Sequence, residues 1–305
     1  MIDIRVSLDS VGYTSKPPDS EVGKISNRIG GAVQVLNCPA SYYEFVQKVG
    51  GQGYTFSPAT FENGVRAQNN FQQMQLLVLD FDGAVSHKDI RDRAIKYKLP
   101  ILFTYDTFSS EEGNERFRVV FLNDAPIEDK RGAKILKNAL MTIFPETDKT
   151  DTDISKMYYG GKSCRYYNPE HRTVTPESII IGMNNYLYET RGPTHHKKYL
   201  KSFADKHGIR LNESGLLDTS NTGNQTKGVG KSSDGKNSPN SIIFSKGNGE
   251  ILPNATNNYF QIHLRDECTN ISVEKRQPKN HSEYMSSTIK DFHRYCRLFR
   301  EFESG

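Results

Sequence analysis

The sequence predicts an α+β fold, in which one sheet is built from elements in the order β-α-β-β-α-β. Two observations predict it. Between residues 76 and 159, short apolar runs bounded by turn residues alternate with two longer segments of helical spacing. The second and third runs are separated by residues 109–114, a polar loop too short to hold a helix. This order is the split β-α-β arrangement, whose first and third strands are neighbours at the centre of the sheet.

The first predicted strand, residues 76–82, carries the main functional signal. Its apolar residues lead directly into Asp80-Phe81-Asp82-Gly83. Side chains alternate along a strand, so Asp80 and Asp82 share one face and lie about 7 Å apart. Two carboxylates at this spacing can hold a divalent cation, and without one we expect them to repel each other. A strand end followed by an Asp-Gly turn would produce the same residues with no site.

The next elements follow from turn and cap signals. Ser86 is a good N-cap for a helix that Pro100 ends, and a second helix begins after Pro126 with apolar residues at helical spacing. The remaining strands are predicted at residues 101–105, 116–122 and 156–159. In the third strand, Arg116 and Arg118 share a face, and the central position of that strand brings them beside the carboxylates of the first.

The flanking segments predict additional parts of the chain. Upstream, a helix at 41–49 and an aromatic extended stretch at 53–61 indicate a small α/β module. Downstream, we expect a strand at 178–181 and a helix near 197–206. Residues 212–258 have the composition of a flexible linker, and 282–302 form an amphipathic helix. We therefore predict a catalytic domain at 1–185 and, at 186–305, the linker with a smaller C-terminal helical subdomain.

Charge and cysteine usage bound the partners and the compartment. Residues 1–180 carry 22 Lys and Arg against 23 Asp and Glu, whereas residues 181–305 carry 18 against 13. The basic surplus of the second part suits a polyanionic partner. The four cysteines are scattered without a CxxC pair, and neither a signal peptide nor an apolar run of membrane-spanning length is present. We therefore expect a cytoplasmic protein with no membrane partner.

Two alternative functions fit part of this pattern. Asp80-Phe81-Asp82-Gly83 also matches the DxDG motif of haloacid dehalogenase-like phosphatases, in which the first Asp attacks a phosphoryl group. That family requires a doubly wound parallel sheet. The β-α-β-β-α-β order alone would also suit a non-catalytic RRM-like module that binds single-stranded nucleic acid. Such a module needs exposed aromatic residues on its central strands, where this sequence has carboxylates and arginines.

Together, these residues resemble the archaeo-eukaryotic primase superfamily, in particular the primase-polymerases of plasmids, phages and other mobile elements. The family's first motif resembles Asp80-Phe81-Asp82. Its second motif falls at residues 107–110, where Ser110 stands at the position of the family's His. Its third motif resembles Asp148. The resemblance covers residues 40–170 and implies an RRM-like catalytic sheet preceded by an α/β module.

The resemblance also implies an activity and its partners. The activity is template-dependent joining of nucleotides by a DNA primase-polymerase, with two Mg²⁺ or Mn²⁺ ions held by Asp80, Asp82 and Asp148. The nucleotide would be bound by Ser109, Ser110, Arg116, Arg118, Lys156 and Arg165. Expected partners are nucleoside triphosphates, a single-stranded DNA template with its primer, and a replicative helicase in the same or another polypeptide. From its charge, we expect the C-terminal helix to hold template through Lys290, Arg294 and Arg297.

Overall fold

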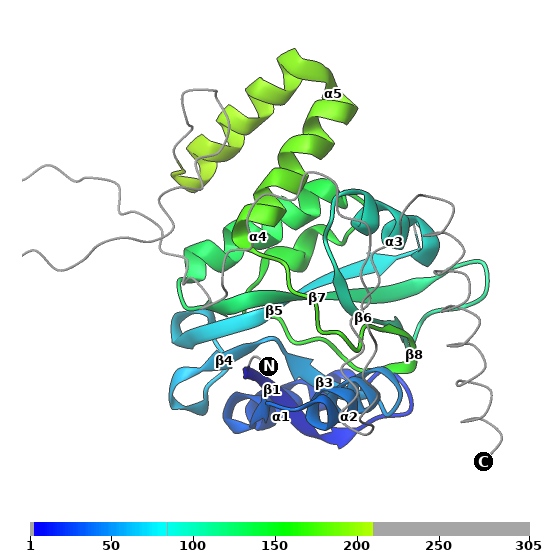
Figure 1. The fold of residues 1–305 in the computed structure, drawn as a ribbon. Helices are drawn as coiled ribbons and strands as arrows, with labels where there is room; N and C mark the ends of the chain where they lie inside the picture. Colours follow the sequence, from blue (N-terminus) through cyan, green and yellow to red (C-terminus); the bar gives the residue numbers. More distant parts are fainter. Residues whose placement is uncertain (1–2, 84, 210–305) are drawn as a thin grey trace, which may run out of the picture. The chain divides into compact units, whose positions relative to one another are not determined.

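The computed structural model describes residues 3–83 and 85–209, which form two antiparallel sheets with helices (Figure 1). The predicted linker and C-terminal helix, with Lys290, Arg294 and Arg297, lie outside these residues. The first sheet has the strand order β2-β1-β3 and belongs to the N-terminal module. The module consists of β1 (Ile4–Gly12), α1 (Asp19–Gly31), β2 (Val33–Leu36), α2 (Pro39–Gly50) and β3 (Tyr54–Ser57). The predicted helix at 41–49 is α2, whereas α1 was not predicted.

The second sheet holds the acidic strand at its centre. Its strand order is β4-β5-β7-β6-β8, and every pairing between these strands is antiparallel. The strands are β4 (Ala59–Phe61), β5 (Phe71–Asp82), β6 (Ile101–Thr107), β7 (Arg116–Ile127) and β8 (Gly161–Tyr167). The helices are α3 (His87–Lys96), α4 (Lys130–Ile143) and α5 (Pro176–His207). The mixed α+β class is confirmed, and the antiparallel sheet is incompatible with the parallel sheet of the phosphatase alternative.

The strand order agrees with the prediction at the centre of the sheet and differs at its edge. Strands β5 and β7 are neighbours, and β6 and β7 form the predicted hairpin. The last strand is β8, not residues 156–159, and it pairs with β6 instead of β5. Two other segments already occupy the edge of β5: β4 pairs with its first half, and Thr147 bridges Phe81 near its end. The RRM-like order is therefore not the one observed.

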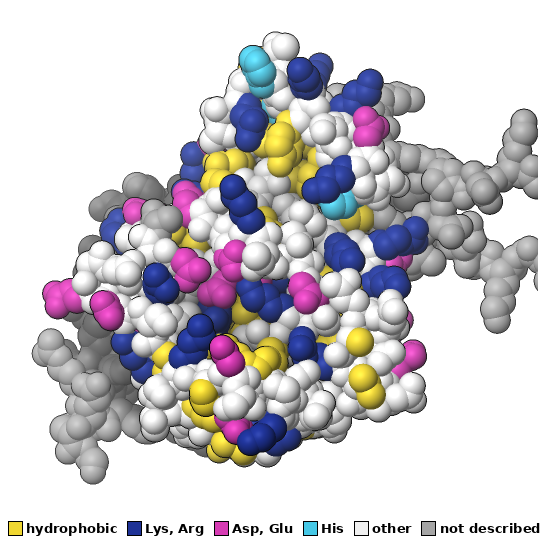
Figure 2. All heavy atoms as spheres, turned by 180° about the vertical axis from the view of Figure 1, so that it is seen from behind, with side chains coloured by type: hydrophobic (Ala, Val, Ile, Leu, Met, Phe, Trp, Pro, Cys, Tyr) yellow, Lys and Arg dark blue, Asp and Glu magenta, His cyan; other side chains and the backbone are white. Residues whose placement is uncertain are grey.

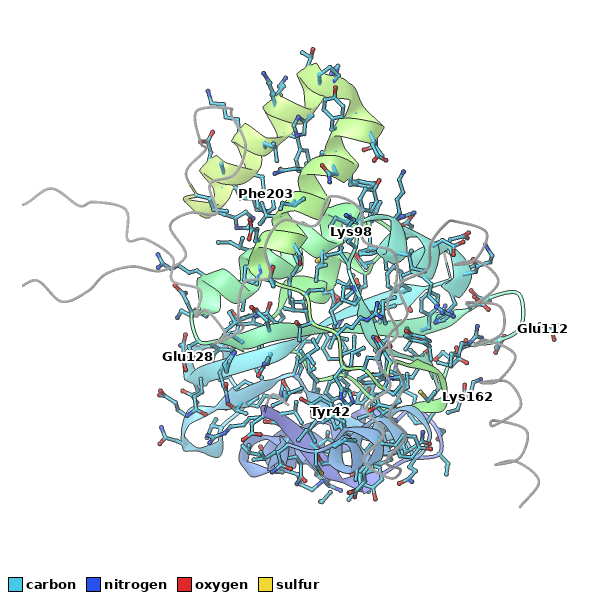
Figure 3. The ribbon with its side chains drawn as sticks, in the orientation of Figure 1. Tyr42, Lys98, Glu112, Glu128, Lys162 and Phe203 are labelled. Atoms are coloured by element: carbon cyan, nitrogen blue, oxygen red, sulfur yellow. The ribbon has the colours of Figure 1, made fainter. Side chains whose placement is uncertain are left out.

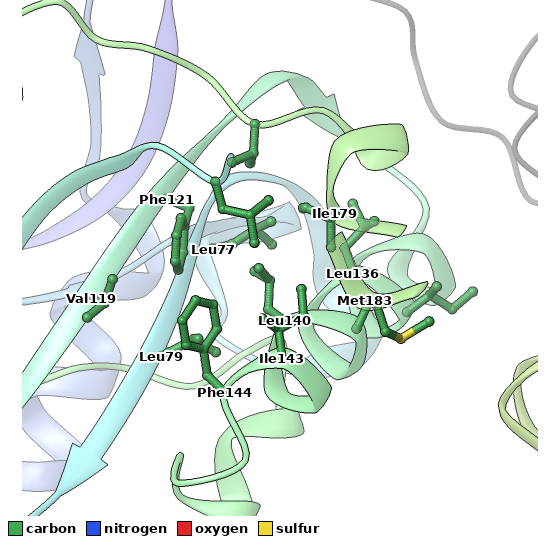
Figure 4. Close-up of a cluster of buried hydrophobic side chains, with 14 of the residues drawn as sticks. Leu77, Leu79, Val119, Phe121, Leu136, Leu140, Ile143, Phe144, Ile179 and Met183 are labelled. Carbon is green, nitrogen blue, oxygen red and sulfur yellow. The ribbon is translucent and has the colours of Figure 1, made fainter. Parts of the chain in front are cut away.

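Both faces of this sheet are covered. Side chains of β5 and β7 alternate between two cores, so both strands read as almost continuous apolar runs. On one face, Leu77, Leu79 and Phe121 pack against α4 and the start of α5 (Figure 4). On the other face, Leu76, Val78 and Val120 pack against the N-terminal module. Since alternate side chains of a strand share a face, Asp80 lies on the same face as Leu76 and Val78. The N-terminal module therefore covers the face of the sheet that bears the acidic residues.

Helix α5 is a hairpin of two arms. Gly192 has φ 71° and is followed by Pro193, which together break the helix between the arms. Leu187 of the first arm and Leu200 and Phe203 of the second all belong to the core over α4. The predicted strand at 178–181 is wrong, because it lies in the first arm. The predicted helix near 197–206 is confirmed as the second arm. No helix within the described residues is long and apolar enough to span a membrane.

A close approach of two glycines joins the N-terminal module to the segment before β8. A Cβ atom on Gly160 would lie 2.3 Å from the carbonyl carbon of Gly53, so only glycine fits there. This contact fixes the backbone of Tyr159, whose carbonyl oxygen accepts hydrogen bonds from Arg118 Nη1 and, at 3.1 Å, from Tyr105 Oη. The glycine pair therefore helps to position an arginine of the candidate site.

We expect Gly160→Ala to lower the free energy of unfolding by about 1–3 kcal/mol, because the added methyl group must displace backbone. The matched control is Gly23→Ala. Gly23 lies in α1, where an added Cβ atom would have no neighbour within 4 Å, so this change should raise stability by up to about 1 kcal/mol. Urea denaturation of both variants checks the difference. Equal stability of the two would show that the Gly53–Gly160 contact is not tight in solution.

Candidate active site

The acidic strand end is paired with arginines across the sheet. In the register of β5 and β7, Asp80 is opposite Arg118 and Asp82 is opposite Arg116. Arg118 donates from Nε to Asp80 Oδ1 at 3.0 Å and from Nη2 to Asp80 Oδ2 at 3.2 Å, a bidentate pair. Asp80 and Arg118 are buried, whereas Asp82 is exposed. The two arginines therefore lie beside the carboxylates as the sequence predicted. The expected repulsion is offset at Asp80, because Arg118 neutralises it.

A segment after α4 brings Asp148 to the same place. The Asp148 amide donates to the Asp80 carbonyl at 2.9 Å, and the Asp80 amide donates to Asp151 Oδ2 at 3.2 Å. Burial acts to raise the pKa of Asp148, but hydrogen bonds from Thr150 and the charge of Lys156 outweigh it and hold that pKa below its usual range. Asp148 is therefore ionised at neutral pH. Asp80 of the first motif and Asp148 of the third motif thus lie close together.

Lys156 lies among three of these carboxylates. Its Nζ is 3.7 Å from Asp80 Oδ2, 3.6 Å from Asp148 Oδ2 and 3.2 Å from Asp151 Oδ1. Residues 3–83 and 85–209 contain no group of three or more His, Cys, Asp or Glu side chains arranged to hold a metal ion. Acidic and basic side chains also intermingle across the middle of the face in Figure 2. The ammonium group of Lys156 therefore stands where a cation shared by these carboxylates would be expected.

Behind Lys156 is a buried polar triad that the sequence analysis missed. Asp151, Lys137 and Tyr158 are almost completely buried. Lys137 Nζ donates to Tyr158 Oη at 2.8 Å and lies 3.4 Å from Asp151 Oδ1, while Tyr158 Oη donates to the same oxygen at 2.5 Å. Burial lowers the pKa of Lys137, and Asp151 opposes that shift. Since Asp151 also accepts the Asp80 amide, the triad supports the end of the acidic strand. The available signal was a lysine inside the apolar stripe of α4.

The other predicted nucleotide-binding residues lie elsewhere. Arg165 donates from Nε to Asp106 Oδ2 at 2.7 Å and from Nη1 to Glu115 Oε1 at 2.6 Å. Ser110 Oγ accepts the Arg116 amide at 3.0 Å, and Ser109 is exposed in the same loop. These side chains border a polar pocket on the side of the molecule where Figure 3 labels Lys162 and Glu112. The pocket is lined by Asp106, Ser110, Glu111, Glu112, Gly113, Glu115, Lys162 and Arg165.

We call Asp80, Asp82 and Asp148 the acidic group. The polar pocket and the acidic group lie on opposite faces of the sheet. Tyr105 is opposite Arg118 in the register, whereas Asp106 is opposite Phe117, whose ring stacks on Phe81 in the helix-covered core. Alternation along β6 therefore directs Asp106, and with it Arg165, away from Asp80. The six residues predicted to bind nucleotide do not form one site: Arg116, Arg118 and Lys156 accompany the carboxylates, and Ser109, Ser110 and Arg165 do not.

Comparisons with known proteins add little to this geometry. No family model matches the sequence, and no curated protein matches it. Among solved structures, the chain is similar to the AEP domain of the primase-polymerase (PrimPol) of cyanophage S-2L. The alignment covers 59% of this chain and 88% of that one, with 10% sequence identity and a TM-score of 0.34. A likeness this distant does not support an assignment of function.

Proposed function

We propose that this chain is a nucleotidyltransferase of the primase-polymerase type, which joins nucleotides on a single-stranded DNA template. The observation that supports the proposal is that Asp80 and Asp148 lie close together at Lys156, with Arg118 paired to Asp80 and with Asp82 opposite Arg116 at the end of the same strand. Phosphoryl transfer requires carboxylates for divalent cations and positive groups for the phosphates, with little other chemistry from the protein. This acidic and basic group supplies both.

The donor set suits a hard divalent cation. Carboxylate oxygens are the ligands that Mg²⁺ and Mn²⁺ prefer, and Asp80, Asp82 and Asp148 are the residues that would hold two such ions. Bound ions would activate the attacking 3′ hydroxyl and neutralise the triphosphate. In the free protein, Lys156 and Arg118 already neutralise much of the carboxylate charge. Metal binding is therefore expected to be weak alone and stronger with the nucleotide, which brings its own negative charge.

Arg116 is the residue best placed to contact that nucleotide. It is partly exposed beside Asp82, and its Nε is buried without a hydrogen-bond partner within the described residues. A buried donor without a partner is costly, and a phosphate oxygen would satisfy it. Arg118 has a different role, because its guanidinium group donates hydrogen bonds to Asp80 and to the Tyr159 carbonyl. We assign Arg116 to the phosphates and Arg118 to the orientation of Asp80.

A synthesis assay tests the proposal. The full chain is incubated with Mg²⁺ or Mn²⁺ and either ribo- or deoxynucleoside triphosphates, on a bare single-stranded template and on a primed one. We expect template-dependent products with at least one nucleotide set. Absence of products under all of these conditions would overturn the assignment.

Lys156→Met tests the metal site independently of activity. Removal of the ammonium leaves three carboxylates with less neutralisation, so the affinity for Mn²⁺ alone should rise about tenfold or more. Titration calorimetry measures this affinity. The control is Lys162→Met, since the Lys162 ammonium donates to the Ser110 carbonyl and has no carboxylate partner within the described residues. Unchanged Mn²⁺ binding in Lys156→Met would argue against a metal site at these carboxylates.

A further inference from the structure

The second arm of α5 carries an exposed basic face. Its inward side chains, Leu200 and Phe203, are in the core over α4, and Figure 3 labels Phe203. Its outward side includes Lys197, Lys198 and Lys201, all exposed, which we call the lysine face. Figure 2 shows Lys and Arg side chains over this hairpin, with hydrophobic side chains exposed between them. None of the three lysines has an ion-pair partner in the part of the chain that the structure describes.

The lysine face is not arranged for the stability of the helix itself. Lys197 and Lys201 are four residues apart and Lys198 and Lys201 three apart, spacings at which like charges on a helix repel. The helix dipole favours cations in the last turn of a helix, which here contains Lys206 and His207. The three residues of the lysine face all lie before that turn and do not gain this stabilisation. Repulsion of this kind is relieved when a polyanion lies across the face.

An aromatic ring is exposed beside the lysine face. Tyr188 of the first arm is 56% exposed, and its ring lies edge-on to that of His196 at 5.7 Å, next to Lys197. Arg191 stacks on the Tyr199 ring at 4.8 Å, which adds another exposed cation at the bend between the arms. Exposed aromatic rings with backbone-contacting cations are the two components of single-strand nucleic-acid binding, because bases stack on the former and phosphates contact the latter.

From these contacts, we propose that the lysine face and Tyr188 bind single-stranded nucleic acid through its phosphates and one stacked base. The contact reads no sequence, because lysines act as point charges without the paired donors that recognise a base edge. This surface deepens the proposed function by supplying a template-holding element within the described residues.

The surface is fixed relative to the acidic group. Tyr199 Oη lies 3.2 Å from Thr142 Oγ1 in the last turn of α4, which leads toward Asp148. Asp148 follows Thr142 by six residues, so even a fully extended connection would span at most about 22 Å. Helix α5 and the Asp80 side chain lie on opposite faces of the sheet, so a strand bound on α5 would reach the carboxylates only around the edge of the sheet.

The test measures binding of a fluorescent oligothymidylate to the full chain by anisotropy over a series of salt concentrations. Lys197→Gln, Lys198→Gln and Lys201→Gln together should reduce the slope of log affinity against log salt by about two, since each single-strand contact contributes about 0.7. Tyr188→Ala should weaken binding about tenfold or more, with recovery in Tyr188→Phe. The matched control changes Lys24, Lys88 and Lys96 to Gln, which removes the same charge from three lysines that have acidic partners.

The outcomes separate this inference from the proposed function. Binding should persist in the variant that changes Asp80 and Asp82 to Asn, so the inference can hold even if no synthesis is detected. Equal salt slopes for the α5 variant and the matched control would overturn it. So would lysine-dependent binding to anionic phospholipid vesicles without lysine-dependent binding to the oligonucleotide, since the partner would then be a membrane surface.

Discussion

Simultaneous replacement of Asp80 and Asp82 by Asn is expected to lower nucleotide addition about 10³-fold or more. Divalent ions held by carboxylates supply several kcal/mol of charge stabilisation in phosphoryl transfer, and three factors of ten correspond to about 4 kcal/mol. Asn retains an oxygen that can accept a hydrogen bond from Arg118, so the variant should fold better than one with Ala at these positions. Single-turnover primer extension measures the loss, and the thermal unfolding midpoint verifies the fold.

The matched control for this variant is Asp92→Asn with Glu128→Gln, which removes two exposed carboxylates away from the site. It should extend primers at the rate of the unchanged protein. Undiminished extension by the Asp80 and Asp82 variant would remove these residues from the mechanism. Turnover of a simple phosphate ester that depends on Mg²⁺ and is lost in Asp80→Asn would indicate phosphatase chemistry instead.

Asp151→Leu is expected to lower the free energy of unfolding by about 3–5 kcal/mol. The change leaves the buried Lys137 without its carboxylate and the Asp80 amide without its acceptor. Lys137→Met combined with Asp151→Leu should cost less than Asp151→Leu alone, because no buried charge then lacks a partner. Asp92→Leu is the control, since its exposed pair with Lys88 should contribute less than about 1 kcal/mol. Urea denaturation measures all of these variants.

The stability of Asp151→Leu should also depend on pH in a defined direction. Burial already lowers the pKa of Lys137 in the folded protein, and loss of Asp151 lowers it further. Between that lowered pKa and the value of about 10.4 in the unfolded chain, the unfolded state binds more protons than the folded state. Stability should therefore rise with pH through this window, relative to the unchanged protein. A stability difference that does not vary with pH would mean that loss of Asp151 does not lower the pKa of Lys137 further.

Local patterns were sufficient to predict the centre of the fold. The alternation in Asp80-Phe81-Asp82 and in Arg116-Phe117-Arg118 determines which side chains share a face. The β6–β7 hairpin and the connection through α3 then make β5 and β7 neighbours. The pairing of Arg118 with Asp80 follows from these two facts. Asp148 was found through a resemblance, and its place beside Asp80 is due to backbone hydrogen bonds that no local pattern encodes.

The wrong strand predictions concern segments whose local sequence is compatible with more than one secondary structure or pairing partner. The run Ser178-Ile179-Ile180-Ile181 has the composition of a strand, but Thr175 and Ser178 form a capping box that starts α5. Residues 156–159 also resemble a strand, yet Tyr158 bridges Phe56 of the N-terminal module. The position of β8 beside β6 depends on which sheet edge is free, a property of the whole fold. The buried Lys137 was missed because a lysine is ordinarily assigned to the surface.

The bond that joins the Asp80 amide to Asp151 spans 71 residues, and the Ser57 hydroxyl meets the Lys156 carbonyl across 99. The acidic group therefore consists of contacts between segments that are remote along the chain. Closing such loops costs entropy before any favourable contact forms, so folding through them is slow compared with a helix or hairpin. During refolding, the local elements should appear first, and this group of charges should assemble only when the N-terminal module docks on the larger sheet.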